Sequence, residues 1–155
     1  MEAAMKVLYD KGGGEGKQVV SIVQQMMEDN RKCPVMAGQT HPIIILEGLD
    51  GTGKTTIVEG LQQKMGEVNC LRSPPDCLSS FRPHFDGQVP HVRRAFYLVG
   101  NYACALNIKK NADKPIVIDR FWPSTMAYAL AIDHQVCSVV SSRVCFSCTL
   151  HVVTV

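Results

Sequence analysis

The segment of this 155-residue chain with the clearest chemistry is a glycine-rich run followed by a lysine and two threonines. Residues 48–55 read GLDGTGKT, which fits the pattern G-x-x-x-x-G-K-[ST]. Glycines let such a loop curl so that its N–H groups point at phosphate oxygens, and the following helix adds its partly positive N-terminus. Lys54 would add a full charge on the β- and γ-phosphates, and the Thr55 hydroxyl would complete a magnesium shell. The pattern predicts a site for ATP and Mg²⁺ formed by Gly48, Gly51, Thr52, Gly53, Lys54, Thr55 and Thr56.

A second candidate pair, Asp119 and Arg120, ends the apolar run that starts at Pro115. Ligands of an open parallel sheet sit beyond the carboxyl ends of its strands, so this pair is predicted to lie near the glycine-rich loop. Asp119 could hold magnesium or its water, and the planar fork of Arg120 could clamp a second phosphate. The alternative is that Asp119 caps the next helix and Arg120 is solvated.

Apolar strands and amphipathic helices must position these residues. Continuous aliphatic runs predict buried strands over 42–47, 68–72 and 115–119. Apolar residues at helical spacing predict helices over 18–30, 54–65 and 90–111, and one beginning near 124. Such alternation is typical of an α/β fold, here a P-loop parallel sheet with flanking helices. By contrast, residues 1–17 are predicted to be a loose lead-in and 78–89 to be irregular.

Composition limits the partners that this chain can have. Apolar residues make up 46% and charged residues 19%, with a net charge of +2, which excludes disorder and a general affinity for nucleic acid. The aliphatic run 43–46, like every other uninterrupted apolar run of the chain, is too short to span a membrane. An odd number of cysteines, seven, without a secretory leader favours a reduced intracellular compartment, mitochondrial or cytoplasmic. We therefore expect small-molecule partners, no nucleic acid and no membrane.

Several motifs carry a resemblance to the thymidylate kinase family. Residues 47–56, EGLDGTGKTT, resemble its P-loop, with Asp50 at the position of the family's loop aspartate. Residues 71–74, LRSP, are similar to its L-R-x-P segment, and 119–121, DRF, resemble its D-R-[YF] motif. The stretch 93–102, RRAFYLVGNY, is closer to the branch of mitochondrial-type UMP/CMP kinases. The resemblance covers residues 42–133.

This resemblance implies transfer of the ATP γ-phosphoryl group to a pyrimidine nucleoside monophosphate (UMP, CMP or dTMP), and it allows a homodimer. Lys54, Asp119 and Arg120 would be the catalytic parts. By analogy Asp50 would hydrogen-bond the acceptor sugar, and Arg120 would hold its phosphate. Phe96 or Tyr97 would stack on the base, with ordinary core packing as the alternative. Further arginines are either phosphate contacts or solvated surface residues: Arg72, Arg82, Arg93 and Arg94.

The chain departs from the family pattern in two respects. Gly51 stands where some members carry an arginine, and no arginine-rich lid follows residue 133. The resemblance thus predicts a lead-in (1–41), a C-terminally truncated P-loop domain lacking strands four and five (42–133), and a divergent tail (134–155). We expect poor turnover, or an ATP-binding remnant without any. A switch GTPase is disfavoured because the chain has no N-K-x-D motif.

The tail contains two further patterns. Residues 144–152 alternate between apolar and other side chains, which predicts a strand that could cover the edge of 42–47. Cys145 and Cys148, with Cys137 and His151 nearby, could bind zinc. A lone C-x-x-C is weak support for a metal site, and packing or no role is the alternative.

Overall fold

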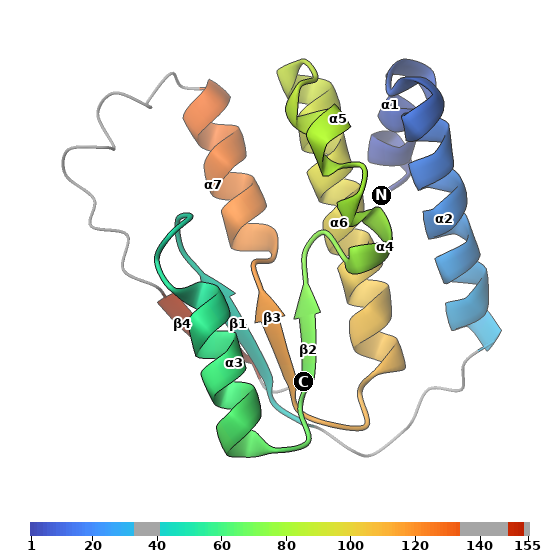
Figure 1. Ribbon diagram of the computed structural model, residues 1–155. Coiled ribbons are helices and arrows are strands. Elements are labelled where there is room, and N and C mark those ends of the chain that lie inside the picture. The colour runs from blue at the N-terminus through green and yellow to red at the C-terminus, as the bar shows by residue number, and fades with distance from the viewer. Residues whose placement is uncertain (33–40, 134–148, 154–155) are drawn as a thin grey trace.

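The computed structural model describes residues 1–32, 41–133 and 149–153. These form a mixed α/β architecture built on one four-stranded sheet with the order β2-β3-β1-β4 (Figure 1). The strands are β1 (Ile43–Glu47), β2 (Asn69–Arg72), β3 (Ile116–Asp119) and β4 (Thr149–Val153). β1, β3 and β2 are parallel, as the three apolar runs predict, whereas β4 is antiparallel to β1.

Alternating side chains of the central strands face two separate cores. Leu46 and Val117 pack with Val58 and Leu61 of α3 (Lys54–Met65), which covers one face of the sheet. On the opposite face, Ile116 and Ile118 pack with Cys104 and Ile108 of α6 (Pro90–Lys110). The continuous aliphatic runs arise because both faces of these strands are covered.

The register places the carboxyl ends of the parallel strands level with one another. Leu46 of β1 lies opposite Asp119 of β3, and Arg72 of β2 lies opposite Asp119 on the other side. The glycine-rich loop leaves β1 at this same edge of the sheet, as Figure 1 shows. Residues far apart in the sequence are thereby brought to one end of the fold.

The predicted loose lead-in over 1–17 is wrong. The chain forms a helical hairpin, α1 (Glu2–Lys11) followed by α2 (Gly13–Lys32), which extends the predicted helix 18–30. Both helices pack along α6 (Figure 1). The hairpin contributes the following apolar side chains to a core shared with α6: Leu8, Val19, Val20 and Val23.

The glycines of residues 12–16 make this hairpin, and they are not a flexible linker. Gly13 has a φ of 67°, which suits the reversal between the two helices. Gly16 lies so close to α1 that an added Cβ would be 2.1 Å from the carbonyl oxygen of Leu8. The sequence pattern suggested a loose lead-in because a helix–helix turn and a flexible linker use the same residue type.

The prediction that 78–89 is irregular is also wrong in part. Two short helices lie here, α4 (Asp76–Ser79) and α5 (Arg82–Asp86). They form because Leu78 and Phe85 are fully buried in the core of the α1–α2 hairpin and α6. The last helix, α7 (Trp122–Asp133), starts at Trp122, close to the predicted start near 124. No helix in the described part of the chain is long and apolar enough to cross a membrane.

The tail covers the edge of β1, as its alternation predicts. β4 runs antiparallel to β1, with Val153 opposite Ile43 and Thr149 opposite Glu47. The predicted strand began at residue 144, and its portion 144–148 lies outside the described residues. The prediction is therefore confirmed for 149–152.

Candidate functional site

The glycine-rich loop joins β1 to α3 in the way that the motif predicts. Gly51 and Gly53 have φ values of 78° and 80°, a region that side chains with a Cβ rarely adopt. Gly53 immediately precedes the first residue of α3, Lys54. The partly positive N-terminus of a 12-residue helix therefore opens directly onto the loop.

Lys54 is the most buried cation of the described chain, with 6% of its surface exposed. Its Nζ donates a hydrogen bond of 2.5 Å to the carbonyl oxygen of Leu49. The Thr52 hydroxyl donates to the same oxygen at 2.8 Å. A neutral carbonyl compensates a buried ammonium only in part, so this position favours an anionic ligand.

Asp119 and Thr55 provide a candidate position for a divalent cation. The Oδ1 atom of Asp119 is buried and has no hydrogen-bond partner among the described residues. An unsatisfied carboxylate oxygen is costly, and a bound cation would remove that cost. Oxygen ligands are also those that Mg²⁺ prefers, so the donor set of Asp119 and the Thr55 hydroxyl fits this ion.

Asp50 and Arg120, predicted to hold the acceptor, contact each other. Nη2 of Arg120 lies 2.6 Å from Oδ1 of Asp50, whose side chain is 93% exposed, whereas that of Arg120 is 19% exposed. Arg120 has a φ of 67° and also donates a hydrogen bond of 3.3 Å to the Ser124 hydroxyl. Because the pair is open to solvent on the Asp50 side, its net contribution to stability is small. A ligand phosphate could replace the Asp50 carboxylate without a large cost.

Glu47, which the sequence did not mark as a positioning residue, anchors the segment that carries Arg120. One carboxylate oxygen accepts a hydrogen bond of 2.9 Å from the backbone N–H of Phe121, and the other accepts one from the Ser124 hydroxyl. Glu47 is only 6% exposed. The end of β1 thus holds the turn between β3 and α7. Only the position of Glu47 at a strand end hinted at this role.

Asn101 is a second positioning residue that the sequence did not reveal. It is fully buried in the middle of α6. Its Oδ1 accepts a hydrogen bond of 2.5 Å from the Ser73 hydroxyl, and its Nδ2 donates to Thr125 at 2.9 Å. A polar residue inside a helix gives no sequence signal of this kind, because its two partners come from distant segments.

A cavity of about 780 Å³ brings most of the predicted site together. Among its lining residues, five arginines and one lysine outnumber three aspartates. The cations are Lys54, Arg72, Arg82, Arg93, Arg94 and Arg120, and the acids are Asp50, Asp86 and Asp119. The sequence left two alternatives for four arginines, a phosphate contact or a solvated surface position. All four lie in the cavity wall: Arg72, Arg82, Arg93 and Arg94. Three of them have protein partners: Arg72 pairs with Asp76 at 3.1 Å, Arg94 donates to the Ala129 carbonyl at 3.3 Å, and Arg82 is hydrogen-bonded to Tyr97.

Of the two aromatic candidates for base stacking, only Tyr97 lines the cavity. Phe96 is fully buried and stacks on Phe85, with ring centroids 4.4 Å apart. Phe96 is therefore a core-packing residue, which was the alternative to base stacking. The Tyr97 hydroxyl donates a hydrogen bond of 2.6 Å to Oδ1 of Asp86. Burial, together with this hydrogen bond, raises the pKa of Tyr97. The hydroxyl therefore stays neutral at physiological pH.

Arg82 completes this polar group on the α5 side of the cavity. Burial disfavours its charge, but the hydrogen bond to Tyr97 and the nearby carboxylates of Asp86 and Asp50 raise the pKa of Arg82 overall. Arg82 and Asp86 were not singled out as a pair in the sequence. Their spacing of four residues does place both on one side of α5, and this was the one available signal.

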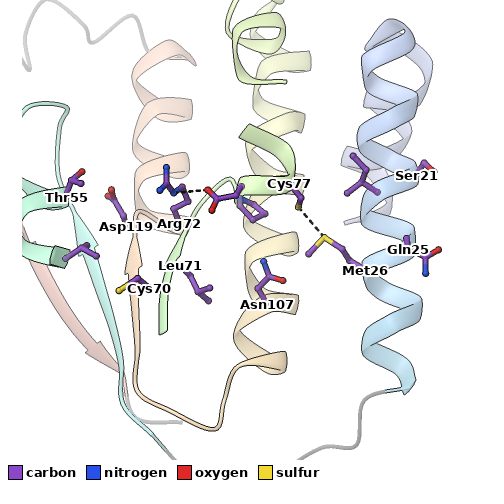
Figure 2. Close-up of a pocket in the computed structure, with 14 residues that line it drawn as sticks. Ser21, Gln25, Met26, Thr55, Cys70, Leu71, Arg72, Cys77, Asn107 and Asp119 are labelled. Atoms are coloured by element: carbon purple, nitrogen blue, oxygen red, sulfur yellow. Dashed lines mark hydrogen bonds and ion pairs between the residues drawn. The ribbon is translucent and has the colours of Figure 1, made fainter. Parts of the chain in front are cut away.

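A second cavity of about 740 Å³ lies around the edge of β2. Figure 2 shows Thr55 and Asp119 at one end of it, and Met26 and Cys77 at the other, toward α2. The Cys77 thiol contacts the Met26 sulfur at 3.9 Å. Thr55 and Asp119 therefore lie where the two cavities meet.

The zinc hypothesis falls on cysteines that lie outside the described part of the chain. Cys137, Cys145 and Cys148 lie outside the described residues. Within the described part, no group of three or more histidine, cysteine or acidic residues could hold a metal ion. The described cysteines Cys70, Cys77 and Cys104 are free thiols. Burial raises the pKa of Cys104 to about 12, so this thiol packs as an apolar group.

Comparison with known proteins finds similarity to a nucleotide kinase. Over 102 residues, 64% of this chain, the sequence is 38% identical to "UMP-CMP kinase 2, mitochondrial" of Homo sapiens. The match spans 21% of that protein, so the chain corresponds to about a fifth of its length. No protein-family model matches the chain, and no solved structure matches it significantly. The chain is therefore similar, over most of its length, to one part of a nucleoside monophosphate kinase.

Proposed function

We propose that this chain binds Mg²⁺ and ATP at residues 48–56 and takes part in phosphoryl transfer to a pyrimidine nucleoside monophosphate. The observation that carries the proposal is the buried Lys54 of a P-loop, which opens into the same cavity of about 780 Å³ as five arginines. The likeness to a protein named UMP-CMP kinase supports this chemistry. That protein's name also says mitochondrial, and we propose the same compartment here.

The P-loop residues would hold the ATP phosphates. Lys54 would exchange the Leu49 carbonyl, now 2.5 Å from Nζ, for oxygens of the β- and γ-phosphates. Thr55 and Asp119 would hold Mg²⁺ directly or through water. When bound, this ion neutralises charge that develops on the phosphate oxygens. The loop and Lys54 would then position the γ-phosphate and compensate its charge.

The acceptor would bind in the arginine-lined part of the cavity. Its phosphate would displace Asp50 from Arg120 and take the planar fork of the guanidinium. Asp50 would then be released toward a hydroxyl of the acceptor sugar. Since Glu47 fixes the segment that carries Arg120, the guanidinium would meet the phosphate with little reorganisation. The base would lie against the half-buried ring of Tyr97.

Thermal unfolding in the presence of ligands tests this proposal first. With Mg²⁺ and an ATP analogue present, UMP, CMP or dTMP should raise the melting temperature more than AMP or GMP does. A ligand at a hundred times its dissociation constant stabilises by about 2.7 kcal/mol. A larger shift with a purine monophosphate would overturn the choice of a pyrimidine.

A coupled assay of ADP release then separates a kinase from a nucleotide-binding protein without turnover. Turnover that depends on a pyrimidine monophosphate and is lost in Lys54→Ala would support the kinase. Binding without phosphoryl transfer would support the alternative function, an ATP-binding chain that has no activity of its own.

A further inference from the structure

Arg82, Asp86 and Tyr97 form a polar group in the wall of the cavity of about 780 Å³. This group is carried by α5 and α6, whereas the P-loop joins β1 to α3 (Figure 1), although the Asp50 carboxylate of that loop lies close enough to raise the pKa of Arg82. All three side chains nevertheless line the same cavity as Lys54 and Arg120. A nucleotide carries its phosphate at one end and its base at the other. With the phosphate on Arg120, the base would reach the α5 and α6 wall.

The chemistry of this group matches the edge on which uracil and cytosine differ. Arg82 offers only hydrogen-bond donors, and the Asp86 carboxylate offers only acceptors. At position 4 of the ring, uracil carries a carbonyl oxygen, which accepts, and cytosine carries an amino group, which donates. A site with one donor and one acceptor side by side can therefore satisfy either base.

Tyr97 lies between the two charged groups. Its hydroxyl donates to Asp86 at 2.6 Å and is also hydrogen-bonded to Arg82. This contact holds both side chains beside the ring on which the base would stack. The ring itself is oriented by its edge-to-face contact with Phe96, whose centroid lies 5.3 Å away. Phe96 in turn is fixed in the core.

From this geometry we propose that Arg82 and Asp86 set the choice between uracil and cytosine, and this rests on the proposed function. Arg82 donates to the 4-oxygen of a uracil nucleotide, and Asp86 accepts from the 4-amino group of a cytosine nucleotide. The same chain then takes both UMP and CMP. Because 6-oxo and 6-amino purines repeat these donor and acceptor patterns, this pair discriminates between uracil and cytosine but not between pyrimidines and purines.

The test measures dissociation constants of UMP and CMP by calorimetry, with Mg²⁺ and a nonhydrolysable ATP analogue present. Arg82→Met should weaken UMP about threefold to tenfold relative to CMP. Asp86→Leu should weaken CMP relative to UMP by a similar factor. Asp86→Asn keeps the side-chain shape and one acceptor. It should also weaken CMP relative to UMP, but by a smaller factor than Asp86→Leu does. Both residues are exposed, so these variants should fold normally.

A matched control is Arg31→Met on α2, an exposed arginine that pairs with Glu28 outside the cavity. It should leave both constants unchanged. The opposite shifts of the CMP-to-UMP ratio are the deciding result, because a merely structural role would weaken both ligands equally. Equal losses for both nucleotides, or no change, would overturn the assignment of Arg82 and Asp86 alone. If wild-type protein binds neither nucleotide, the proposed function fails together with it.

Discussion

At the scale of single residues, burial distinguishes Lys54 from the other lysines of the described chain. Its ammonium group is held against the Leu49 carbonyl, with 6% of the residue exposed. Most lysines keep their charge in water, so a buried one requires a compensating partner. The Leu49 carbonyl, which accepts from it at 2.5 Å, and the Thr52 hydroxyl, which accepts at 3.5 Å, are weak partners compared with phosphate oxygens.

We expect Lys54→Ala to weaken ATP binding about tenfold to a hundredfold. The reason is the loss of a charge-assisted contact worth about 1.5–3 kcal/mol. Titration with a fluorescent ATP analogue in the presence of Mg²⁺ measures the effect. Lys64→Ala, in the last turn of the same helix, is the matched control and should bind normally. Equal affinity in the Lys54 variant and wild type would contradict the site.

Cys104 makes the stability of the fold depend on pH in the alkaline range. Its thiol is fully buried, and its pKa rises from an ordinary value of 9.0 to about 12. Stability from the neutral thiol is complete below pH 9 and is lost as the pH rises toward 12, because the unfolded chain ionises first. Between pH 7.5 and pH 10, wild type should lose about 1.4 kcal/mol more stability than Cys104→Ala.

Urea unfolding at the two pH values measures this difference. Comparing the variant with wild type cancels the contributions of other groups that titrate in the same range. A loss of stability that is the same in both proteins would show that the Cys104 thiol ionises freely in the folded state.

At the scale of elements, the α1–α2 hairpin depends on a close approach at Gly16. An added Cβ there would lie 2.1 Å from the Leu8 carbonyl oxygen, whereas at Gly14 it would meet nothing within 4 Å. Gly16→Ala should therefore separate the helices and destabilise the protein by about 1–3 kcal/mol. Gly14→Ala, in the same helix, should be neutral or stabilising by up to about 1 kcal/mol.

The two glycine variants are compared by the midpoint of thermal unfolding. Because both substitutions add one methyl group to α2, their difference isolates the helix contact from helix propensity. Equal midpoints would mean that the hairpin does not pack as described.

The parts of the fold that could be predicted from the sequence are those with local signals. The strand β1, the loop 48–53 and the helix α3 follow from a buried aliphatic run, glycines and helical spacing. The hairpin α1–α2 was missed because its glycines look like a linker unless Leu8 and α6 are seen beside them. Likewise α5 was missed because it forms around Phe85, which needs partners from distant segments.

Some residues of the candidate site could likewise be predicted from the sequence, and others could not. Lys54, Thr55, Asp119 and Arg120 were predicted from motifs, and all four line one cavity. Glu47 and Asn101 could not be predicted, because they act through hydrogen bonds to residues more than 20 positions away. The pairing of Asp50 with Arg120 joins residues 70 positions apart, and likewise no local pattern encodes it.

At the scale of the whole molecule, the cavity is where the separate layers of the fold meet. Its wall combines the carboxyl ends of the parallel strands with α5, α6 and α7. The strands supply Arg72 and Asp119, the turns that follow β1 and β3 supply the P-loop and Arg120, and the helices supply Arg82, Arg93, Arg94 and Tyr97. The excess of cations over acids in the wall favours a ligand with several negative charges. This arrangement supports joint binding of ATP and a pyrimidine nucleoside monophosphate.

Calorimetric titration of the purified 155-residue chain with UMP and CMP tests joint binding most directly, with Mg²⁺ and a nonhydrolysable ATP analogue present. Joint binding predicts that both nucleotides bind, that AMP and GMP bind at least tenfold more weakly, and that Arg120→Met weakens the pyrimidine nucleotides about tenfold or more. Binding of UMP and CMP that is no tighter than that of the purine nucleotides, or that is unchanged in Arg120→Met, would contradict it.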